Sequence, residues 1–561
     1  MKTKNDIPKG RFIVVSIVLL SVQTMILGCG DVNQQQESST IYYVNSENGN
    51  DSNTGFSQQS AFKTLNKISS IDINPGDKIL LASGKTFKGS LQLKNIKGTK
   101  DNPIIVSSYG DDAKMPYIDA SGFANGVLIE DCSYVEVENL TISADGKEGS
   151  LKNADMRCGV LVKMTKSGKY THVYMNNLTI SSVFFEDEGF ERPKGEVNTA
   201  NGTQKYGYGI RVFNKMANAL LSDVKISSCH IENVGHTGIK FTSYHKDNIY
   251  SISEIEINEN DIVRTGGSGI QMSGVRDAHV YENVVNKSGS NDDSRKWGRG
   301  SGLWTWGSSD VLIEHNKFLN ANGPGDSAGA HIDFNCSNVI IQYCLSVNNA
   351  GGFCEILGNN YNCAYRYNIS VNDGYREKGV DGAFQEGKTF WLSGYCGKNN
   401  TRKGPFNTYF YNNTIYVKKD IIAKIAVDKA SSGVMLVNNI FCILGDNKLV
   451  KGDQYKPEEG GGTYIENVLF ENNLYMNENS WPEDALIQDK KPVIGNPDFK
   501  NPGGLNIDDY IPTNSSLIKD KGVKITKIPD DNKGLEIGLD VKKDILGNEI
   551  KGLPDFGAIE L

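Results

Sequence analysis

Val311-Leu312-Ile313-Glu314-His315-Asn316 is one copy of a short motif that recurs along the middle of the chain. Each copy has two apolar, mostly β-branched residues one position apart, followed by an Asn or another small residue. Short strands repeated at intervals of roughly 20–35 residues are typical of a β-solenoid, in which each repeat forms one turn. Equivalent residues of successive turns then form columns. Further copies occupy residues 135–140, 173–178, 224–229, 255–260, 280–283 and 339–344, and later ones end at Asn368, Asn413, Asn439 and Asn473.

The first 40 residues have the pattern of a targeting and anchoring segment. Basic residues precede an apolar run at 12–27, which is too short to span a bilayer and indicates a signal peptide. Ile26-Leu27-Gly28-Cys29 resembles the lipobox of bacterial lipoproteins, and the resemblance implies cleavage before Cys29 and a lipid on its sulfur. We therefore expect a signal peptide at 1–28, a lipidated tether at 29–40 and a protein bound to the cell envelope through its lipid. The alternatives are an ordinary signal peptide, with secretion, or a single anchor helix.

The rest of the chain is predicted to form one repetitive domain. One repeat runs through most of it, the formal net charge is −8, and nothing suggests a nucleic-acid partner. Nine cysteines besides Cys29 form no disulfide framework. Cys229 and Cys344 occupy the small-residue position of the motif, so we expect the cysteines to be thiols in the core rather than disulfides or metal ligands.

Both ends of the mature chain have patterns of their own. Phe62, Leu65 and Ile68 have helical spacing and predict a short amphipathic helix that closes the first turn. The segments 98–106, 496–499, 515–522 and 555–560 resemble the first and last parts of secreted right-handed parallel β-helix proteins. The resemblance implies an all-β, single-stranded, pectate-lyase-like right-handed parallel β-helix with an N-terminal helical cap. That fold hosts lyases, hydrolases, esterases and adhesins, so it does not name the activity.

These patterns divide the mature chain into three parts. We assign the N-terminal cap and first strands to residues 41–125, the parallel β-helix with its substrate groove to 126–480, and a closing segment to 481–561.

A second repeated element lies between the motif copies: a Gly followed by an apolar residue, as in Gly238-Ile239-Lys240-Phe241-Thr242. If the residue after each Gly points inward, strand alternation gives two outward columns. The first is predicted to contain Arg211, Lys240, Gln271, Trp304, His331, Phe353 and Phe384. The second is predicted to contain Phe213, Thr242, Ser273, Trp306, Asp333, Glu355 and Glu386.

Cations, aromatic rings and carboxylates on one face suit a sugar-binding groove, because sugar rings stack on aromatic side chains and polar groups bind hydroxyls or uronates. The substrate is therefore expected to be a polysaccharide or oligosaccharide. The expected substrate-binding residues are Arg211, Lys240, Gln271, Trp304, Trp306, Phe353 and Trp391.

The two columns also suggest catalytic residues. Strands of adjacent turns lie about 4.8 Å apart, so Asp333 and Glu355 are predicted to place their carboxyl groups roughly 5 Å apart. This is near the spacing of a retaining glycosidase, with one carboxylate as nucleophile and the other as acid/base. Apolar neighbours favour Glu355 as acid/base and leave Asp333 as nucleophile. Glu386 is a third candidate, or the partner in an inverting pair, and His331 lies beside Asp333.

The stretch His331-Ile332-Asp333-Phe334 and the later Phe353-Cys354-Glu355-Ile356 resemble the paired Asp and Glu of the β-helical β-xylosidases of glycoside hydrolase family 120. The resemblance implies an Asp nucleophile and a Glu acid/base on neighbouring turns. It covers about two turns. Phe334 stands where the family has Trp, and Leu357-Gly358-Asn359 replaces its His-Gly-Pro, so the sugar is left open.

Two alternatives to a hydrolase stay open. A polysaccharide lyase needs a base and a cation to neutralise a uronate, and Arg211, Lys240, Arg264 and His331 are candidates. Asp333, Glu355 and Glu386 would then hold calcium, whereas a hydrolase requires no cofactor or metal. The other alternative is a lipoprotein that captures glycans without catalysis. Saturated products, unsaturated products or binding without turnover would distinguish the three.

Overall fold

The computed structural model describes residues 39–144, 157–183, 207–243, 249–289, 299–451 and 465–561, and the structural statements below refer to these residues. Residues 39–561 belong to one compact unit. The predicted signal peptide and the lipidation site Cys29 lie outside the described residues. Among the described helices, none combines the length and the apolar character needed to cross a membrane.

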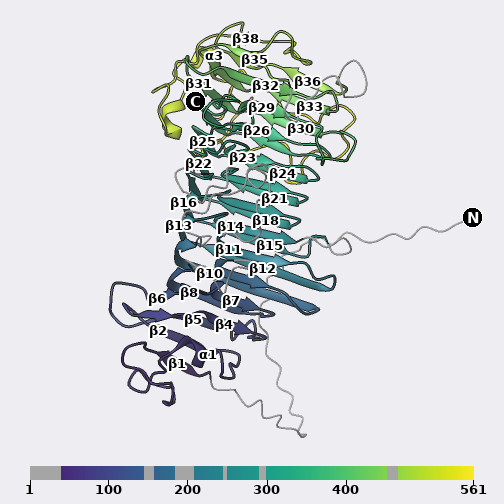
Figure 1. Ribbon diagram of the computed structural model, residues 1–561. Coiled ribbons are helices and arrows are strands. Elements are labelled where there is room, and N and C mark those ends of the chain that lie inside the picture. The colour runs from purple at the N-terminus through teal and green to yellow at the C-terminus, as the bar shows by residue number, and fades with distance from the viewer. Residues whose placement is uncertain (1–38, 145–156, 184–206, 244–248, 290–298, 452–464) are drawn as a thin grey trace, which may run out of the picture. The chain divides into compact units, whose positions relative to one another are not determined.

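One side of the β-helix is a sheet of 12 parallel strands, in which each strand pairs with the corresponding strand of the next turn. Figure 1 labels β11, β14, β23, β26, β29 and β32, which follow one another along the molecule in this order. The strands are β4 (Leu91–Lys94), β7 (Asn125–Glu130), β9 (Cys158–Lys163), β11 (Tyr208–Asn214), β14 (Ile239–Ser243), β17 (Ile270–Ser273), β20 (Leu303–Trp306), β23 (Ala330–Ile332), β26 (Gly352–Ile356), β29 (Lys388–Leu392), β32 (Ala423–Val427) and β35 (Asn447–Leu449).

The other two sides form a continuous sheet, because the long strands β8 and β10 pair along both of them. The first of these two ladders contains β1 (Ile41–Val44), β2 (Lys78–Ala82), β5 (Ile104–Tyr109), β8 (Val135–Ser143), β10 (Gly168–Val183), β12 (Ala219–Ser227), β15 (Ser253–Asn258), β18 (Arg276–Tyr281), β21 (Ser309–Glu314), β24 (Ser337–Gln342), β27 (Ala364–Arg366), β30 (Phe406–Tyr411), β33 (Ser432–Val437) and β36 (Val468–Glu471).

The second ladder continues from the other ends of β8 and β10. It contains β3 (Thr86–Lys88), β6 (Tyr117–Asp119), β13 (His230–Val234), β16 (Asp261–Thr265), β19 (Val284–Asn286), β22 (Lys317–Leu319), β25 (Leu345–Val347), β28 (Ile369–Val371), β31 (Thr414–Val417), β34 (Ile440–Ile443), β37 (Leu474–Tyr475) and β38 (Val493–Ile494). These ladders confirm the predicted parallel β-helix, whose right-handed turns have the hand that parallel crossovers adopt.

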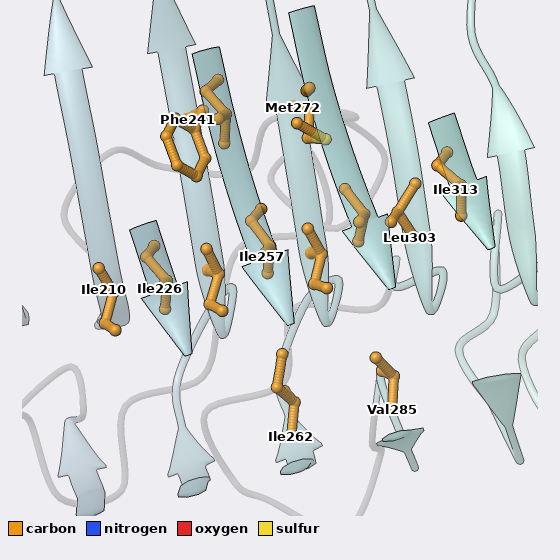
Figure 2. Packing of buried hydrophobic residues seen from close by; sticks show 14 of the residues in the cluster. Ile210, Ile226, Phe241, Ile257, Ile262, Met272, Val285, Leu303 and Ile313 are labelled. Atoms are coloured by element: carbon orange, nitrogen blue, oxygen red, sulfur yellow. The ribbon is translucent and has the colours of Figure 1, made fainter. Parts of the chain in front are cut away.

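The core lies inside the turns, where apolar side chains of the three ladders meet. Figure 2 shows Ile210 and Phe241 of the 12-stranded sheet beside Ile226 and Ile257 of the first ladder and Ile262 of the second. Each of these five side chains is fully buried. The alternation of inward and outward residues therefore gives the core one apolar layer per turn.

An asparagine ladder stacks along the turn between the two ladders and explains the Asn of the opening motif. The Asn283 side-chain amide donates to Oδ1 of Asn316 at 2.9 Å and to the carbonyl of Ile257 at 2.9 Å. The same contact joins Asn413 to Asn439 and Asn439 to Asn473. Every rung is fully buried, so the side-chain amides satisfy turn backbone groups that water cannot reach.

The cysteines agree with the sequence prediction. Cys229 and Cys344 take the ladder position in their turns and are buried, and their backbone N–H groups donate to Asn260 and Asn368. All nine cysteines of the described residues are free and buried.

The ends of the β-helix are covered in different ways. Helix α1 (Leu65–Ile68) buries Leu65 and Ile68 at the first turn, and the Thr64 side chain caps it by accepting from the backbone N–H of Lys67. At the other end Trp481 packs against Phe441 and Phe470.

Residues 499–561 pack on the outside of the second half of the β-helix. This segment includes the 3-10 helix η1 (Ile507–Tyr510) and α3 (Ser515–Ile518). Its side chains form a second core with outward residues of the ladders, among them Ile340 and Tyr409, and Asp531 accepts from the side-chain amide of Asn362 at 2.8 Å.

Candidate active site

The outward column of the 12-stranded sheet follows the predicted register through five strands. Arg211 pairs with Lys240, Lys240 with Gln271, Gln271 with Trp304, and Trp304 with His331. Successive members therefore lie about 4.8 Å apart along the column.

The predicted register is wrong at the next turn. Ala328 bridges to Gly352 and Ile332 pairs with Ile356, so His331 lies beside Glu355 and Asp333 lies beside Leu357. Glu355 in turn pairs with Trp391 of β29. Glu355 thus belongs to the first column and is diagonal to Asp333, at a Cα spacing of about 7–8 Å rather than directly opposite it. The prediction failed because it aligned Gly329 with Gly351, whereas the strands pair Ala328 with Gly352, a register shift of two residues.

Asp333 and Glu355 are both buried on this face, at 8% and 6% exposure. Oδ1 of Asp333 accepts from the backbone N–H of Phe334 at 2.8 Å. A third carboxylate, Asp326, interacts electrostatically with both of them and with His331. We call Asp326, Asp333 and Glu355 the acidic cluster.

Asp326 was missed by the sequence reasoning because it lies in the turn before β23, outside any strand column. Its carboxylate forms an ion pair with Arg299 at 3.0 Å. Its backbone N–H donates to Oε1 of Gln385 at 2.6 Å and its carbonyl accepts from Arg376 at 3.0 Å. Its φ of 46° is in the left-handed region that Asp tolerates better than most residues, so these contacts hold a strained turn in place.

Burial sets the protonation of the acidic cluster. Burial raises the pKa of Asp333 to about 7, with the Asp326 carboxylate acting in the same direction and the Phe334 N–H and Arg299 against it. Burial also raises the pKa of Glu355 well above its usual range, and the charges of Asp326 and Asp333 add to the effect while Lys388 and Arg376 oppose it. Such an arrangement keeps a carboxylic acid available as a proton donor near neutral pH.

His331 is a neutral imidazole in this surrounding. Burial lowers its pKa to about 4, with Asp326 acting in the opposite direction. The ring stacks on Trp304 at 5.7 Å, and Nδ1 lies 2.9 Å from the hydroxyl of Ser301. The Trp304 indole N–H is fixed by the hydroxyl of Ser268 at 2.7 Å. These contacts fix His331, which lies beside Glu355, and Trp304, one strand further along the column.

Trp391 lies on the opposite side of Glu355 in the same column. The ammonium of Lys388 lies 3.8 Å from the centroid of a ring of Trp391, a cation–π contact. Trp391 is 2% exposed, and its indole N–H has no hydrogen-bond acceptor in the described part of the chain. A buried donor without an acceptor is costly, and its position next to a buried carboxyl group is suited to an oxygen of a bound ligand.

An aromatic row flanks the acidic cluster on its Asp333 side. Trp306 meets Phe334 edge to face at 5.9 Å, and Phe334 meets Tyr395 in the same way at 5.7 Å. Phe334 and Tyr395 are partly buried against Leu357 and Trp391. Phe334 and Tyr395 were not among the expected binding residues, although Phe334 directly follows Asp333 in the sequence.

The chain is similar to known parallel β-helix proteins. A family model for the right-handed beta helix region matches residues 208–415, which hold most of the column. Over 93% of the chain, 25% of residues are identical to a lacto-N-biosidase of Bifidobacterium longum. The chain spans 36% of the length of that relative.

Similar solved structures include carbohydrate-active proteins. A complex of XylC, a family 120 β-xylosidase, with xylose covers 93% of this chain and 98% of its own, with a TM-score of 0.50 and 12% identity. A family 136 lacto-N-biosidase from Eubacterium ramulus has a TM-score of 0.49 and 19% identity, and covers 81% of this chain and 68% of its own. The chain is similar to carbohydrate-active parallel β-helix proteins. These findings confirm the resemblance expected from the sequence.

Some predicted site residues lie elsewhere. Phe353 occupies the corner position that Gly residues occupy in the preceding turns, and it points into the core. There the centroid of its ring lies 5.6 Å from that of Tyr365 and 6.1 Å from that of Phe410. It does not face the acidic cluster, contrary to the expectation that it binds substrate. The strand of the next turn is β29, so Phe384 and Glu386 lie in the segment before it rather than in the columns.

Glu386 is engaged in a separate ion pair. Its carboxylate lies 3.1 Å from Lys448 and accepts from the backbone N–H of Lys378 at 2.7 Å. Burial acts to raise its pKa, but these two contacts and Lys424 hold the pKa below its ordinary value. Glu386 is thus an ionised, anchored carboxylate, and the expectation of a third catalytic member is not met by its position.

The cations of the lyase alternative lie away from the acidic cluster. Lys240 and Arg211 are buried four and five strands from Glu355, where both contact the ring of Tyr208. Burial and the neighbouring Arg211 lower the pKa of Lys240 well below its ordinary value. Arg264 lies on β16 of the second ladder and donates to Asn233. Within the described ranges no group of three or more His, Cys, Asp or Glu residues is arranged to hold a metal ion.

Proposed function

We propose that the chain is a glycoside hydrolase whose chemistry takes place at the acidic cluster. The observation that carries the proposal is the pair of buried carboxyl groups, Asp333 and Glu355, whose pKa values burial raises. Glu355 shares its column with Trp304 on one side, beyond His331, and with Trp391 on the other. Aromatic rings and buried carboxyl groups on one face suit the binding and cleavage of a sugar. The similarity to a lacto-N-biosidase supports this reaction class.

Glu355 is proposed as the acid/base, because its surroundings favour the protonated form. Asp333, ionised, attacks the anomeric carbon while Glu355 protonates the leaving glycosidic oxygen, and the C–O bond breaks with its electron pair on that oxygen. Glu355, now a carboxylate, takes a proton from water as the water displaces Asp333. The net reaction is retaining hydrolysis, which requires the two diagonal side chains to bring their carboxyl groups to about 5–5.5 Å from each other.

Asp326 and His331 are proposed to support this chemistry. The Asp326 carboxylate, which pairs with Arg299, acts on both carboxyl groups as a neighbouring negative charge and so favours protonated Glu355. Neutral His331 is available for a hydrogen bond to a sugar hydroxyl. Carboxyl groups supply both the acid and the nucleophile, so we propose that no metal is required, and that chelation leaves the rate unchanged.

The test uses aryl β-lacto-N-bioside and aryl β-xyloside, chosen from the names of the relatives, together with plant and algal polysaccharides. We expect saturated, retained products by NMR, and a loss of about 10³-fold or more in kcat for Asp333→Asn and Glu355→Gln. Glu386→Gln is the matched carboxylate control and is expected to keep its activity. Unsaturated products would identify a lyase instead, and glycan binding without turnover would identify a capture protein.

A second proposal concerns location. The lipobox-like sequence around Cys29 supports a lipid anchor that holds the enzyme on the cell envelope. Cys29→Ala is expected to abolish incorporation of a labelled fatty acid and to release the protein from the membrane fraction. Labelling of the variant at the native level would contradict the anchor.

A further inference from the structure

Tyr361 is a large aromatic residue at an exposed corner of the β-helix, outside the acidic cluster. Its side chain is 43% exposed. Phe406, from the next turn, stacks on one face of the ring at a centroid distance of 4.9 Å and an angle of 21°. On the other side the neighbours in the same column are Ser337 and Ser309, whose side chains are too small to cover a ring. One face of Tyr361 is thus left without a covering ring from the neighbouring turn.

Amide groups lie next to this ring. The hydroxyl of Tyr361 donates to Oδ1 of Asn359 at 3.2 Å, and the amide of Asn359 donates to Oδ1 of Asn335 at 2.7 Å. Both amides are near the surface, and each has donor or acceptor capacity beyond these contacts. A flat ring beside paired amides matches a sugar, whose C–H face stacks on the ring while its hydroxyls bind the amides.

We infer that Tyr361, Asn359 and Asn335 form a secondary binding site for a neutral glycan chain, which we call the aromatic shelf. The inference rests on the proposed function for its ligand class. No charged side chain belongs to the shelf, so an uncharged stretch of sugar is its ligand.

The shelf lies within reach of the acidic cluster. Leu357 sits beside Asp333, and Tyr361 is four residues further along the chain, which spans at most about 14 Å. One glycan chain of a few sugar units therefore reaches from the cluster to the shelf. The shelf is expected to raise the affinity for long substrates and to leave small aryl glycosides unaffected.

The experiment measures binding by affinity electrophoresis in gels that contain arabinoxylan, galactan, alginate or mucin, and hydrolysis of the aryl glycosides in parallel. We expect at least one neutral polymer to retard the native protein and Tyr361→Ala to weaken that retardation about threefold to tenfold. Tyr361→Phe should retain most of the binding. Aryl glycoside kcat and KM should be unchanged in both variants.

Ser337→Tyr provides a second variant that does not remove a native contact. Its new ring is expected to occupy the uncovered face of Tyr361 and to weaken binding as Tyr361→Ala does. Phe123→Ala, at an exposed aromatic remote in sequence, is the control and should bind normally.

Three results would overturn the shelf: no polymer retards the native protein, only the charged polymers alginate and mucin do so, or Tyr361→Ala and Ser337→Tyr both bind as the native protein does. Retardation that depends on Tyr361, with no hydrolysis of any substrate, would instead reject the proposed hydrolase and keep the shelf.

Discussion

Asp333, Glu355 and His331 show how burial acts on single residues of this face. The same loss of hydration raises the pKa of the two acids and lowers the pKa of the imidazole, because it disfavours the charged form in each case. All three are therefore largely neutral in moderately acidic solution. Asp326, which pairs with Arg299, acts electrostatically on all three of them.

The pH dependence of kcat/KM follows from these shifts. Asp333 must be ionised to attack, so activity should fall as the pH decreases below about 7. Glu355 must be protonated, so activity should fall again at alkaline pH. For the native enzyme, kcat/KM plotted against pH is expected to be bell-shaped, with its maximum at neutral to mildly alkaline pH, measured with an aryl glycoside. Full activity at pH 5 would contradict the assigned roles.

The free energy of unfolding should depend on pH in the opposite sense to the rise in activity that ionisation of Asp333 produces. Folding raises the pKa of Asp333, so its contribution to stability is fully present at pH values below the pKa of the unfolded chain. The contribution is lost as the pH rises through the folded pKa of about 7. The Asp333→Asn variant cannot ionise. Its unfolding temperature relative to the native protein should therefore increase between pH 5 and pH 8, and thermal unfolding at the two pH values measures this directly.

The indole N–H of Trp391 gives a prediction for substrate binding. Trp391→Phe keeps an aromatic ring but removes the donor that lacks an acceptor in the described residues. If a substrate oxygen accepts from it, kcat/KM should fall about tenfold, the equivalent of about 1.5 kcal/mol for a buried hydrogen bond. A substrate analogue that lacks that oxygen should show no difference between the two proteins. An equal loss with every analogue would indicate a packing role.

At the scale of the repeated element, the asparagine ladder links neighbouring turns. Asn413 is fully buried and donates to the carbonyl of Tyr365 and to Asn439, while its Oδ1 accepts from Asn368. Asn413→Ala leaves backbone groups of two turns without partners. The expected loss is about 2–5 kcal/mol in the free energy of unfolding, measured in denaturant.

The control for the ladder is Asn48→Ala, at an exposed position outside it, which should change stability by less than about 0.5 kcal/mol. A similar small change for Asn413→Ala would mean that the ladder does not hold the turns together.

At the scale of the whole molecule, the C-terminal segment 499–561 packs along the outside of the turns rather than only over the open end of the β-helix. Asp531 of that segment accepts from the hydroxyl of Tyr409, from the Asn362 amide and from the backbone N–H groups of Lys533 and Gly534. The contacts fix the segment on the outer face of β27 and β30, where it covers apolar residues.

Asp531→Ala should therefore lower stability by about 2–4 kcal/mol and increase binding of a hydrophobic dye before the main unfolding transition. Glu536→Ala, at an exposed site of the same segment, is the control. Because the acidic cluster faces the other side of the turns, aryl glycoside KM should stay unchanged in the folded variant. Dye binding equal to that of the native protein would contradict this role of the segment.

The sequence by itself determined the β-helix, its core and the free cysteines. The β-branched pairs and the Asn positions repeat once per turn, and each turn contacts only its neighbours. The local sequence pattern is therefore sufficient to predict the global fold. The register from Arg211 to His331 followed for the same reason.

Only the tertiary structure decided how the site is assembled. The register shift that places Glu355 beside His331 depends on the turn between strands. Phe353 lies in the core rather than on the predicted outward face, because it occupies a corner position whose side chain points inward. Asp326 and Tyr395 come from segments without a period, as does the outer covering by residues 499–561. Repetition fixes residues within strands, whereas turns and insertions differ in length and are positioned by contacts with distant parts of the chain.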